Sequence, residues 1–588
     1  MDDNRIIIIG AGPAGLAAAY EFIRSGNRVT ILESHDRVGG ISRTESYRNF
    51  YFDIGGHRFF TKIEKINGLW KEMMGDDFIK VSRMSRIFYR DRFFNYPLEV
   101  FNVLINLGII ESIRIPLSYI STQLRPHRKE DTFEQWVSNR FGRRLYETFF
   151  RTYTEKVWGI ACHKIRADWA AQRIKGLSLV AAVVGSLLKD QSVKTLINEF
   201  DYPLRGPGMM WQRFQEAITE AGGRVLLNSE ATCLTHENGA IAKVQFLKDN
   251  KVEEMPAGHL ISTLPVPALV SMLRPEPPEK VRKAAEGLSY RSFLIVILIL
   301  NRKHLFPDQW LYIHDPGVRV GRIQNFKNWS AAMVPDPAKT SLGMEYFCNK
   351  GDDLWNMPDK DLADMASGEL KKLGLAEADD VMDSHVVRQS DAYPVYDEGY
   401  RDKLKILKGY LAGIRNLQTI GRGGTHHYNN MDHSMLTGIL AVENYFGSSH
   451  DLWDVNEEKE YLEEDRKALE VQGALENILD RTFVRMNKFA FATAVGTVSG
   501  LLIFLATIWL VIKGGEVVGP NMRLLGQYFT GYTVSASGSF IAFGYSFFWG
   551  FLFGWLFAYL RNFSLSLYIF WVRKKTEILT LRDFIDYL

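Results

Sequence analysis

The feature that most constrains this sequence is a glycine-rich turn placed directly after a short apolar run. Ile6–Ile9 is a run of four isoleucines, and Gly10-Ala-Gly12-Pro-Ala-Gly15 follows it immediately. Residues 16–24 then have helical composition, and the apolar run 28–32 ends at Glu33. The pattern is GxGxxG between a strand and a helix, followed by a second strand, which predicts an α/β domain with parallel strands.

The spacing within this pattern also indicates a ligand. Gly10, Gly12 and Gly15 allow backbone N–H groups to approach a pyrophosphate at the N-terminus of the helix. Glu33 lies 18 positions after Gly15, where an acidic side chain can hold a ribose hydroxyl. A chance glycine-rich turn would require neither the two strands nor Glu33. The sequence therefore predicts a dinucleotide-binding site.

Further glycines favour FAD as the dinucleotide. Gly39-Gly40 follows the acidic strand end, and it resembles the second glycine doublet of flavoproteins of the amine oxidase and glutathione reductase type. Far downstream, residues 417–420 read as a strand that runs into a glycine turn. Asp432-His433-Ser434 then precedes a predicted helix at 435–445, and we interpret it as an N-cap near the flavin, because no GxSxG accompanies it.

Two long uncharged runs lie near the C-terminus. Residues 489–512 and 534–560 contain no charged side chain, and each is long enough to cross a hydrocarbon core of about 30 Å. A pair of buried core helices is the disfavoured alternative, because uncharged runs of this length are rare in soluble cores. The two runs predict a transmembrane hairpin.

The basic residues beside these runs predict their orientation. The loop between the runs holds only Lys513 and Arg523. The outer flanks carry more basic residues, namely Arg481, Arg485, Lys488, Arg561, Arg573, Lys574 and Lys575. Both flanks should face the cytoplasm, which predicts an integral membrane protein with its catalytic body on the cytoplasmic face of the inner membrane.

Each apolar run has a GxxxG spacing. The pairs are Gly496/Gly500 and Gly550/Gly554. They could pack the two helices together or pair protomers into a homo-oligomer, and ordinary glycine use in membrane helices is the equal alternative. The apolar stretch 101–120 is interrupted by charged residues and a proline, and it predicts a core or interfacial helix and no third span.

Composition excludes several other classes of protein. The net charge of +3 gives no reason to expect a nucleic-acid partner. The cysteines Cys162, Cys233 and Cys348 lie far apart without CxxC or Cys/His spacing, so we expect no metal site and no disulfide framework. The N-terminus has neither the basic start nor the apolar core of a signal peptide. These observations fit a reducing compartment.

The motifs together predict an α/β protein with several structural units. We expect a Rossmann-like FAD-binding domain assembled from discontinuous segments, a mixed helical and antiparallel-sheet substrate domain, and the membrane hairpin. The expected bounds are 1–95, 205–265 and 415–450 for the FAD domain, 96–204 and 266–414 for the substrate domain, 451–488 for a linker helix, 489–560 for the hairpin and 561–588 for a cytoplasmic tail.

Several motifs occur in the order found in one family. They are Phe52-Asp-Ile-Gly55-Gly56-His57-Arg-Phe-Phe60, Asn95-Tyr96-Pro97, Tyr153-Thr-Glu-Lys-Val-Trp158-Gly159, Trp310-Leu-Tyr312, Gly321-Arg322-Ile-Gln-Asn325-Phe326, Ala392-Tyr393-Pro394, and Gly421-Arg422-Gly423-Gly424 with Tyr428 and Asp432-His433-Ser434. Over residues 6–446 the sequence resembles the UDP-galactopyranose mutases, flavoenzymes that interconvert pyranose and furanose sugars. The glycines Gly55 and Gly56 would then form the histidine loop beside the flavin.

The resemblance implies a role for each matched residue. His57 would lie against the flavin, Arg173 and Arg322 would clamp the substrate phosphate, and Arg422 would lie by the flavin or the phosphate. The hydroxyls of Tyr312, Tyr393 and Tyr428 would donate hydrogen bonds, and Trp158 and Tyr153 would border the sugar. Simpler interpretations remain open: His57 could satisfy backbone groups, Arg173 could be a solvated residue, and Trp158 and Tyr153 could be core aromatics.

The resemblance also implies a mechanism. N5 of the reduced flavin would be the nucleophile at the anomeric carbon, phosphate would be the leaving group, and no net redox change would occur. The protein would orient the reactants and stabilise the departing phosphate. A separate reductant of the flavin would be a required partner. No side-chain nucleophile is expected.

The sequence departs from the family in several places, and two of them bear on the substrate. His426-His427 replaces the aromatic and basic residues before the last tyrosine, and the family's soluble members have no membrane hairpin. An anchor suits a sugar carried on a lipid, so we expect a polyprenyl-phosphate-linked sugar of a glycan biosynthesis route. Two alternatives remain: a membrane flavin oxidoreductase or desaturase acting on a lipid, and an FAD-bearing scaffold without activity.

Overall fold

The computed structural model describes residues 5–96, 98, 100–127, 129–167, 199–455, 486–514 and 519–585. The chain divides into two compact units. The body comprises Met1–Lys459 with Phe584–Leu588, and the hairpin unit comprises Glu460–Asp583. Arg173 and most of the expected linker helix at 451–488 lie outside the described residues.

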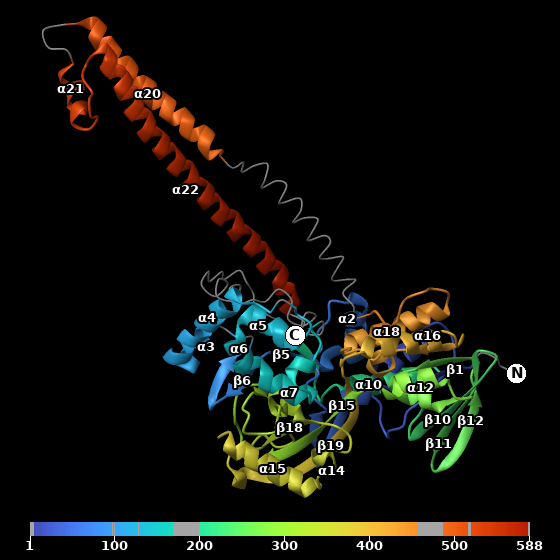
Figure 1. Ribbon diagram of the computed structural model, residues 1–588. Coiled ribbons are helices and arrows are strands. Elements are labelled where there is room, and N and C mark those ends of the chain that lie inside the picture. The colour runs from blue at the N-terminus through green and yellow to red at the C-terminus, as the bar shows by residue number, and fades with distance from the viewer. Residues whose placement is uncertain are drawn as a thin grey trace. The chain divides into compact units, whose positions relative to one another are not determined.

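A five-stranded parallel sheet forms the first half of the body (Figure 1). Its order is β20 (Leu417–Thr419), β13 (His259–Ser262), β1 (Ile6–Ile9), β2 (Val29–Leu32) and β9 (Arg224–Leu226). The strands come from three distant stretches of the chain, which confirms the expected discontinuous Rossmann-like fold. The isoleucine run forms the central strand, β1. All four of its side chains are buried, because both faces of this parallel sheet are covered.

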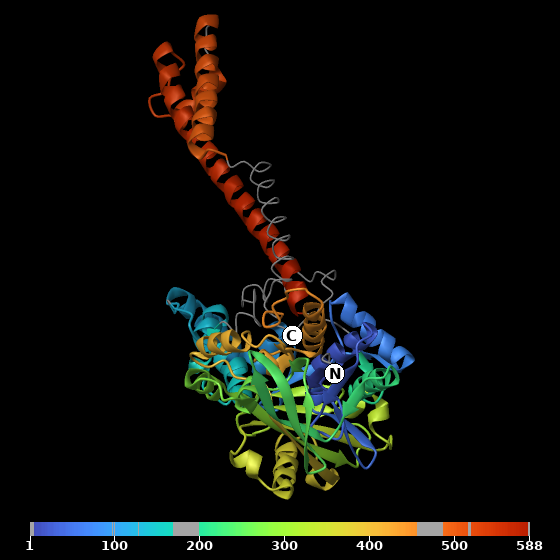
Figure 2. The same ribbon diagram turned by 90° about the vertical axis from the view of Figure 1, so that its right-hand side faces the viewer.

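Alternate isoleucines of β1 serve two different cores. Ile6 and Ile8 join the cluster formed with α1 (Pro13–Arg24), α2 (Glu64–Met74), α10 (Gly208–Glu220) and α18 (Met431–Tyr445). Ile7 and Ile9 join the opposite cluster, whose elements are β10 (Ser229–Glu237), β11 (Ala240–Lys248), β12 (Lys251–Pro256), β14 (Leu273–Arg274), α11 (Val266–Met272), α12 (Glu279–Glu286) and α16 (Tyr400–Leu411). Figure 2 shows β10, β11 and β12 facing the viewer.

A seven-stranded mixed sheet forms the second half of the body. Its order is β19 (Val381–Pro394), β15 (Tyr290–Leu300), β18 (Thr340–Cys348), β17 (Arg322–Asn325), β16 (Trp310–Ile313), β6 (Ser85–Tyr89) and β7 (Arg92–Asn95). Only the β16–β6 pair in this sheet is parallel. Leu294, Val296 and Leu298 join the cluster that includes residues of α15 (Asp359–Lys372), which Figure 1 shows at the bottom of the body.

The sheets divide the chain differently from the boundaries expected from sequence. Strands β6 and β7 lie within residues 1–95, yet they pair into the seven-stranded sheet. Helices α12 and α16 lie within 266–414, yet they pack against the five-stranded sheet. Long-range strand pairing decides the first placement and the packing of buried side chains decides the second, and hydropathy along the sequence records neither.

Shorter elements complete the body. The hairpin β3 (Thr44–Tyr47) and β4 (Phe50–Asp53) precedes the histidine loop, and β5 (Phe78–Ser82) pairs with β8 (Glu199–Pro203). The helices beside the second sheet are α3 (Val100–Leu107), α4 (Ile109–Leu124), α5 (Phe133–Phe141), α6 (Arg143–Leu145), α7 (Thr152–Trp158), α13 (Phe326–Trp329) and α14 (Asp353–Asn356). A π-helical stretch at Tyr146–Arg151 joins α6 to α7.

The hairpin unit contains two long apolar helices, α20 (Lys488–Lys513) and α22 (Ala536–Ile585). A short helix, α21 (Pro520–Arg523), lies between them in sequence. Lys488–Lys513 and Ala536–Leu565 are each long and apolar enough to cross a membrane, by length and composition. Helix α22 continues past residue 560, so the expected tail at 561–588 begins as an extension of the second apolar helix.

The four glycines of the GxxxG pairs lie between α20 and α22. A Cβ on Gly496 would lie 2.8 Å from the carbonyl oxygen of Phe547, and a Cβ on Gly550 would lie 2.8 Å from Ser499 Oγ. Gly500 and Gly554 have equally close neighbours on the opposite helix. The sequence left open what the GxxxG glycines do. In the structure they allow α20 and α22 of the same hairpin to pack closely.

Candidate flavin and substrate site

The first glycine turn is held in shape by Glu33. The Ala11 N–H donates to Glu33 Oε2 at 2.7 Å, and the His35 N–H donates to Oε1 at 2.9 Å. Gly10 has a φ of +96°, and a Cβ on Gly15 would lie 2.0 Å from the carbonyl oxygen of Gly10. These contacts leave no room for side chains at Gly10 and Gly15. Glu33 therefore braces the turn in addition to any contact it makes with a ribose.

The second glycine doublet lies against the first turn. The Gly39 N–H donates to the carbonyl oxygen of Ala11 at 2.8 Å, and a Cβ on Gly40 would lie 3.2 Å from the Cα of Gly12. Gly12 has only the Gly40 Cα within 4 Å of its own added Cβ. The two turns thus present backbone without side chains, which fits the pyrophosphate of a dinucleotide.

The glycine-rich segment Gly421–Gly424 and Gly438 of helix α18 also reach the first turn. A Cβ on Gly438 would lie 2.3 Å from the carbonyl oxygen of Ala14, and a Cβ on Gly421 would lie 3.0 Å from the Cβ of Ala14. The predicted N-cap at Asp432-His433-Ser434 is wrong. The helix begins at Met431 after the N-cap Asn430, and Asp432, His433 and Ser434 are buried inside its first turn.

His57 lies in the loop after β4, close to two arginines. A Cβ on Gly55 would lie 3.8 Å from His57 Cε1 and 3.9 Å from Arg322 Nη2. Burial, followed by the charges of Arg422 and Arg322, lowers the pKa of His57 to about 3. The imidazole is therefore neutral at physiological pH, and its Nδ1 has no hydrogen-bond partner among the described residues. Gly56, the neighbour of His57, is exposed.

Arg322 is paired with a buried carboxylate. Its Nε and Nη2 donate to Glu345 Oε2 at 2.8 and 2.5 Å, and Gln324 Nε2 donates to Oε1 at 2.8 Å. Arg322 on β17 and Glu345 on β18 are direct cross-strand partners. Burial opposes the charge of Arg322, but Glu345 and the nearby tyrosines raise its pKa well above the ordinary value. The guanidinium is thus permanently charged and fixed in direction.

The aromatic residues named by the family resemblance gather around Arg322 and Arg422. The rings of Tyr393 and Tyr428 stack with centroids 5.6 Å apart, and the Arg422 Cζ lies 4.6 Å from the Tyr428 centroid. Tyr153 meets Tyr312 edge to face at 5.4 Å. We call the group the arginine–tyrosine cluster, and its members are Arg322, Arg422, Tyr153, Tyr312, Tyr393 and Tyr428.

The electrostatics of this cluster favour neutral donors beside fixed cations. Burial raises the pKa of Tyr393 to about 12 and that of Tyr153 well above its ordinary value, although Arg322 acts in the opposite direction on both. Their hydroxyls therefore stay protonated. Arg422 donates to the carbonyl oxygens of Asn429 and Ala392, which fixes its guanidinium between the last glycine segment and β19.

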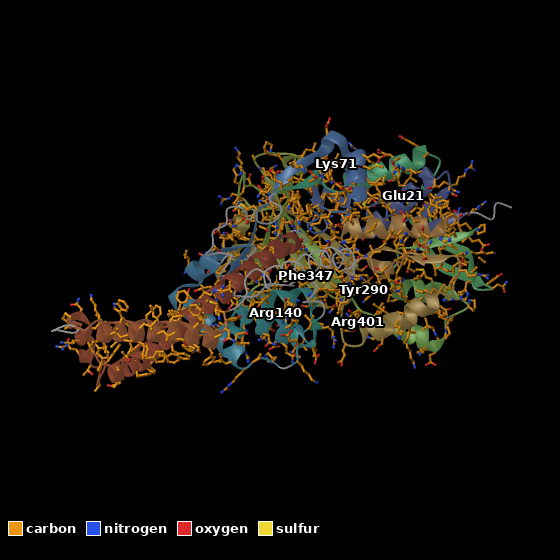
Figure 3. The ribbon with its side chains drawn as sticks, turned by 90° about the horizontal axis from the view of Figure 1, so that it is seen from above. Glu21, Lys71, Arg140, Tyr290, Phe347 and Arg401 are labelled. Atoms are coloured by element: carbon orange, nitrogen blue, oxygen red, sulfur yellow. The ribbon has the colours of Figure 1, made fainter. Side chains whose placement is uncertain are left out.

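Trp158, which was also expected at the site, lies in a hydrophobic core. Trp158 is 5% exposed in the core of the helical region, with its ring 6.2 Å from that of Tyr396. Figure 3, a view of the side chains from above, labels Phe347 and Tyr290 in the body. Phe347 lies on β18 beneath Arg322, and the Tyr290 hydroxyl donates to the carbonyl oxygen of Gly423 at 3.1 Å.

Sequence reasoning missed several charged residues in this region. Arg58 and Arg83 both lie over the ring of Trp310, with Cζ atoms 5.5 and 5.8 Å from its centroid. Arg58 directly follows His57 in the matched histidine motif, a signal that could have identified it. No spacing signal points to Arg83 or Glu345, because only strand pairing brings them to the site.

Comparison with known proteins agrees with this geometry. A model of the flavin containing amine oxidoreductase family matches residues 13–444. L-amino-acid oxidases of Crotalus adamanteus and Siganus canaliculatus are 47% and 48% identical to the chain over 59 residues. These stretches cover 10% and 9% of this chain and 11% of each oxidase, so the chain spans about a tenth of the length of these curated relatives.

Solved structures with the same fold align with about three quarters of the chain. A reduced UDP-galactopyranose mutase aligns with 77% of this chain and 97% of its own, at a TM-score of 0.67 and 21% identity. A putative protoporphyrinogen oxidase from Exiguobacterium aligns with 76% and 99%, at a TM-score of 0.58 and 17% identity. These likenesses establish the fold, and the family match with the bare glycine turns establishes FAD as the cofactor. The chain belongs to the flavin containing amine oxidoreductase family, and it is an FAD-dependent flavoenzyme with the fold of UDP-galactopyranose mutase.

Proposed function

We propose that the protein is a flavin-dependent pyranose–furanose mutase that acts on a phosphate-linked sugar carried by a polyprenyl chain. The observation that carries this proposal is the arginine–tyrosine cluster beside the histidine loop. Fixed guanidinium groups and protonated tyrosine hydroxyls suit the oxygens of a phosphate ester and a sugar. An apolar lipid or a small amino acid would not require such a concentration of positive charge.

Each part of the site then has a defined task. Reduced FAD, when bound, supplies the nucleophile through N5, which accounts for a site built without a side-chain nucleophile. Arg322 and Arg422 hold negative charge on the departing phosphate, and the rigid pairing of Arg322 with Glu345 keeps that donor preorganised. The hydroxyls of Tyr153, Tyr312, Tyr393 and Tyr428 donate to sugar or phosphate oxygens, and the raised pKa values of Tyr153 and Tyr393 keep those two protonated.

His57 contributes a neutral imidazole to the same region. Its lowered pKa removes a third positive charge from the neighbourhood of Arg322 and Arg422. A neutral imidazole has one donor and one acceptor nitrogen, and Nδ1 is free to bind a group of the cofactor or the sugar. His57 is thus suited to orient a ligand and unsuited to act as an acid at neutral pH.

The two long apolar helices support the lipid-linked form of the substrate. A water-soluble nucleotide sugar gives no reason for an enzyme to be held at a bilayer. A polyprenyl-phosphate sugar resides there, so anchoring raises the local concentration of enzyme and substrate in the same plane. In this proposal the chain is an integral membrane protein whose body faces the cytoplasm, and a separate donor reduces the flavin.

A second candidate function is oxidation or desaturation of a membrane lipid. It is favoured by the family match and by the short similarity to L-amino-acid oxidases. It gives no account of the pairing of Arg322 with Glu345 or of the stacked Tyr393 and Tyr428 beside Arg422. The mutase is therefore the better-supported proposal.

One experiment separates these two functions. The purified full chain is reduced with dithionite without oxygen and incubated with synthetic polyprenyl-phosphate pyranoses, both pentose and hexose, or with UDP-galactose. The mutase predicts a furanose product from a lipid-linked sugar, formed only by the reduced protein. Turnover of UDP-galactose alone would contradict the lipid-linked substrate. Bleaching of the oxidised flavin by the lipid, with no furanose product, would establish the oxidoreductase.

A further inference from the structure

Helix α4 carries a row of large apolar side chains on its outer surface. They follow one another at intervals of three and four residues, and they are Ile110, Ile113, Leu117, Ile120 and Leu124. Their exposed fractions range from 54% to 78%. This spacing keeps all five on one side of the helix, so they form a continuous apolar surface. We call these five residues the α4 stripe.

The opposite side of α4 is attached to the rest of the body. Ile115 is 3% exposed and belongs to a hydrophobic core. Glu111 forms a two-pronged ion pair with Arg144, whose Nε and Nη2 lie 2.8 and 2.7 Å from the two carboxylate oxygens. The backbone N–H of Arg144 also donates to Ser118 Oγ at 3.0 Å. These contacts fix which side of α4 faces outward.

Further contacts attach the C-terminal half of the helix. Gly142 lies between α5 and α6, and a Cβ there would lie 2.9 Å from the Cα of Tyr119. Gln123 Nε2 donates to the carbonyl oxygen of Asn139 at 2.6 Å. The helix is thus held along its length, and the exposure of the stripe is a property of the packed body.

Helix α4 is unsuited to cross a membrane but suited to lie along one. Its 16 residues span about 24 Å at 1.5 Å per residue, which is short of a hydrocarbon core of about 30 Å. It also contains Glu111, Arg114 and Pro116. A helix with one exposed apolar side and charged residues elsewhere lies in the plane of the interface. The sequence left a core or an interfacial helix open for residues 101–120, and the exposed stripe favours the second.

Exposed basic side chains lie beside the stripe. Arg125 and Lys129 follow Leu124 in the sequence, both are exposed, and neither forms an ion pair with another residue that the structure describes. Arg114, on the helix itself, has a side chain that is 61% exposed. These cations complement the headgroups of anionic lipid when the stripe is inserted.

Two nearby carboxylates are committed to arginines. Glu111 is the only acidic residue between positions 100 and 129, and it pairs with Arg144 at 2.7 Å. Its side chain is 17% exposed, so it adds little negative charge to the outer surface. Glu130 pairs with Arg140 at 2.7 Å. Neither carboxylate is therefore available to repel an anionic bilayer strongly.

A second copy of the chain fits the stripe less well than a bilayer does. In an isologous dimer the same residues of both copies meet, so Arg114, Arg125 and Lys129 would approach their own counterparts. Like charges across an interface oppose association, and the paired Glu111 does not compensate them. The two helices of this chain that are long and apolar enough to cross a membrane favour a lipid occupant independently.

We propose that the α4 stripe inserts into the boundary between headgroups and acyl chains of a bilayer that contains anionic lipid. The body then has an attachment to the membrane that is separate from the two apolar helices. Ile105 of the adjoining helix α3 is also 76% exposed. Figure 1 shows α3 and α4 at the edge of the body, where a lipid surface can reach them.

The attachment has a consequence for the site. Ile115, on the inner side of α4, belongs to the same hydrophobic core as Tyr393, and Tyr312 and Tyr428 pack against that core. Insertion of the stripe would therefore orient the arginine–tyrosine cluster relative to the lipid surface. This holds for any substrate that resides in a bilayer, so the attachment does not depend on whether the site is that of a mutase or an oxidoreductase.

Depth-dependent quenching in lipid discs tests the attachment. The full chain with Cys233→Ser and Leu117→Cys is labelled with a bimane fluorophore, and the remaining cysteines, Cys162 and Cys348, are buried. The discs contain anionic lipid and phospholipids brominated at shallow or deep acyl positions. We expect strong quenching at position 117, greater from the shallow bromines, because an interfacial helix buries its apolar side only about 5–10 Å.

Val252→Cys in the same Cys233→Ser background is the matched control. Val252 is an apolar side chain on β12 that is 68% exposed, and Glu253 and Glu254 follow it. We expect no quenching at this position. Equal quenching at positions 117 and 252, or no quenching at 117, would overturn the proposal. Cross-linking between copies through position 117 would also overturn it and assign the stripe to a protein interface.

Replacement of the stripe tests whether its own side chains insert. Ile113→Gln with Leu117→Gln is compared with the parental stripe, and the reporter is Ile120→Cys in both. We expect quenching at position 120 to fall to background, while the unfolding midpoint in detergent is unchanged because both replaced side chains are already exposed. Retained quenching would show that the apolar helices alone hold α4 near the bilayer, and it would overturn insertion.

Arg125→Gln with Lys129→Gln tests the choice of an anionic lipid. In discs with anionic lipid the ratio of inserted to free stripe, measured by quenching at position 117, should fall on the order of tenfold. In discs of neutral lipid these substitutions should have no effect. Arg224→Gln with Lys251→Gln replaces two exposed basic residues on β9 and β12 and should leave quenching unchanged. An equal loss in neutral and anionic discs would contradict charge complementarity.

Discussion

Arg322 and Glu345 are direct neighbours on adjacent antiparallel strands, and their side chains form a two-pronged ion pair in the middle of the seven-stranded sheet. Glu345 is fully buried, and the Arg322 side chain is 18% exposed. A pair with this burial fixes the direction of the guanidinium. The site therefore presents Arg322 as an oriented, preorganised hydrogen-bond donor.

Removal of either partner of this pair should be strongly destabilising. Glu345→Ala and Arg322→Ala should each lower the free energy of unfolding by about 3–5 kcal/mol, because each leaves an uncompensated buried charge or a broken network. The double variant should cost clearly less than the sum of the two. Chemical unfolding of the four proteins measures this coupling, and strictly additive effects would contradict it.

The two glycines Gly12 and Gly15 should respond differently to the same substitution. Gly12→Ala places its methyl group near Gly40 alone, so the protein should fold while its FAD content falls. Gly15→Ala forces a methyl group to 2.0 Å from the Gly10 carbonyl oxygen, so it should disrupt the turn itself. Flavin absorbance per chain and the unfolding midpoint measure the two effects. Full flavin content in Gly12→Ala would contradict a pyrophosphate at this turn.

Buried histidines should make the body sensitive to acid. Burial, with the charge of Lys156, lowers the pKa of His314 to about 3, well below an unfolded value of about 6.5. Below pH 6.5 His314 therefore becomes protonated in the unfolded chain, whereas it stays neutral in the folded chain. Stability from this group is complete above pH 6.5 and falls by about 1.4 kcal/mol per pH unit below it.

His314→Phe should remove this dependence and keep the stacking with Tyr153, whose ring lies 4.9 Å away. Unfolding midpoints between pH 8 and pH 5 should decline less steeply for the variant than for the parent. Identical pH profiles would show that His314 is protonated without penalty in the folded protein.

A larger side chain at Gly496 should separate the two apolar helices. Its Cβ would meet the Phe547 carbonyl oxygen and the Phe551 side chain, so Gly496→Leu cannot preserve the packing of α20 on α22. Size-exclusion of heated, detergent-solubilised protein should show earlier aggregation. Val498→Leu, at a position on the same helix that is 58% exposed, is the matched control and should behave as the parent does.

The sequence contained the local elements of the fold because they depend on local constraints. The isoleucine run and its glycine turn predict a strand, a helix and a nucleotide site, since only glycine fits positions such as Gly10 and Gly15. The uncharged runs predict the two apolar helices by length and composition. A family resemblance added the histidine loop and the tyrosines, which lie around Arg322 and Arg422.

The tertiary structure decided what the sequence left open. Arg83 and Glu345 reach the site because β6 pairs with β16 and β17 pairs with β18, and no periodicity encodes such long-range pairing. The same pairing placed β6 and β7 in the second sheet, and close helix packing assigned all four GxxxG glycines to one hairpin. The sequence by itself determined the elements and the cofactor, because those depend on local backbone geometry. The distribution of charge at the site was decided only when distant strands met.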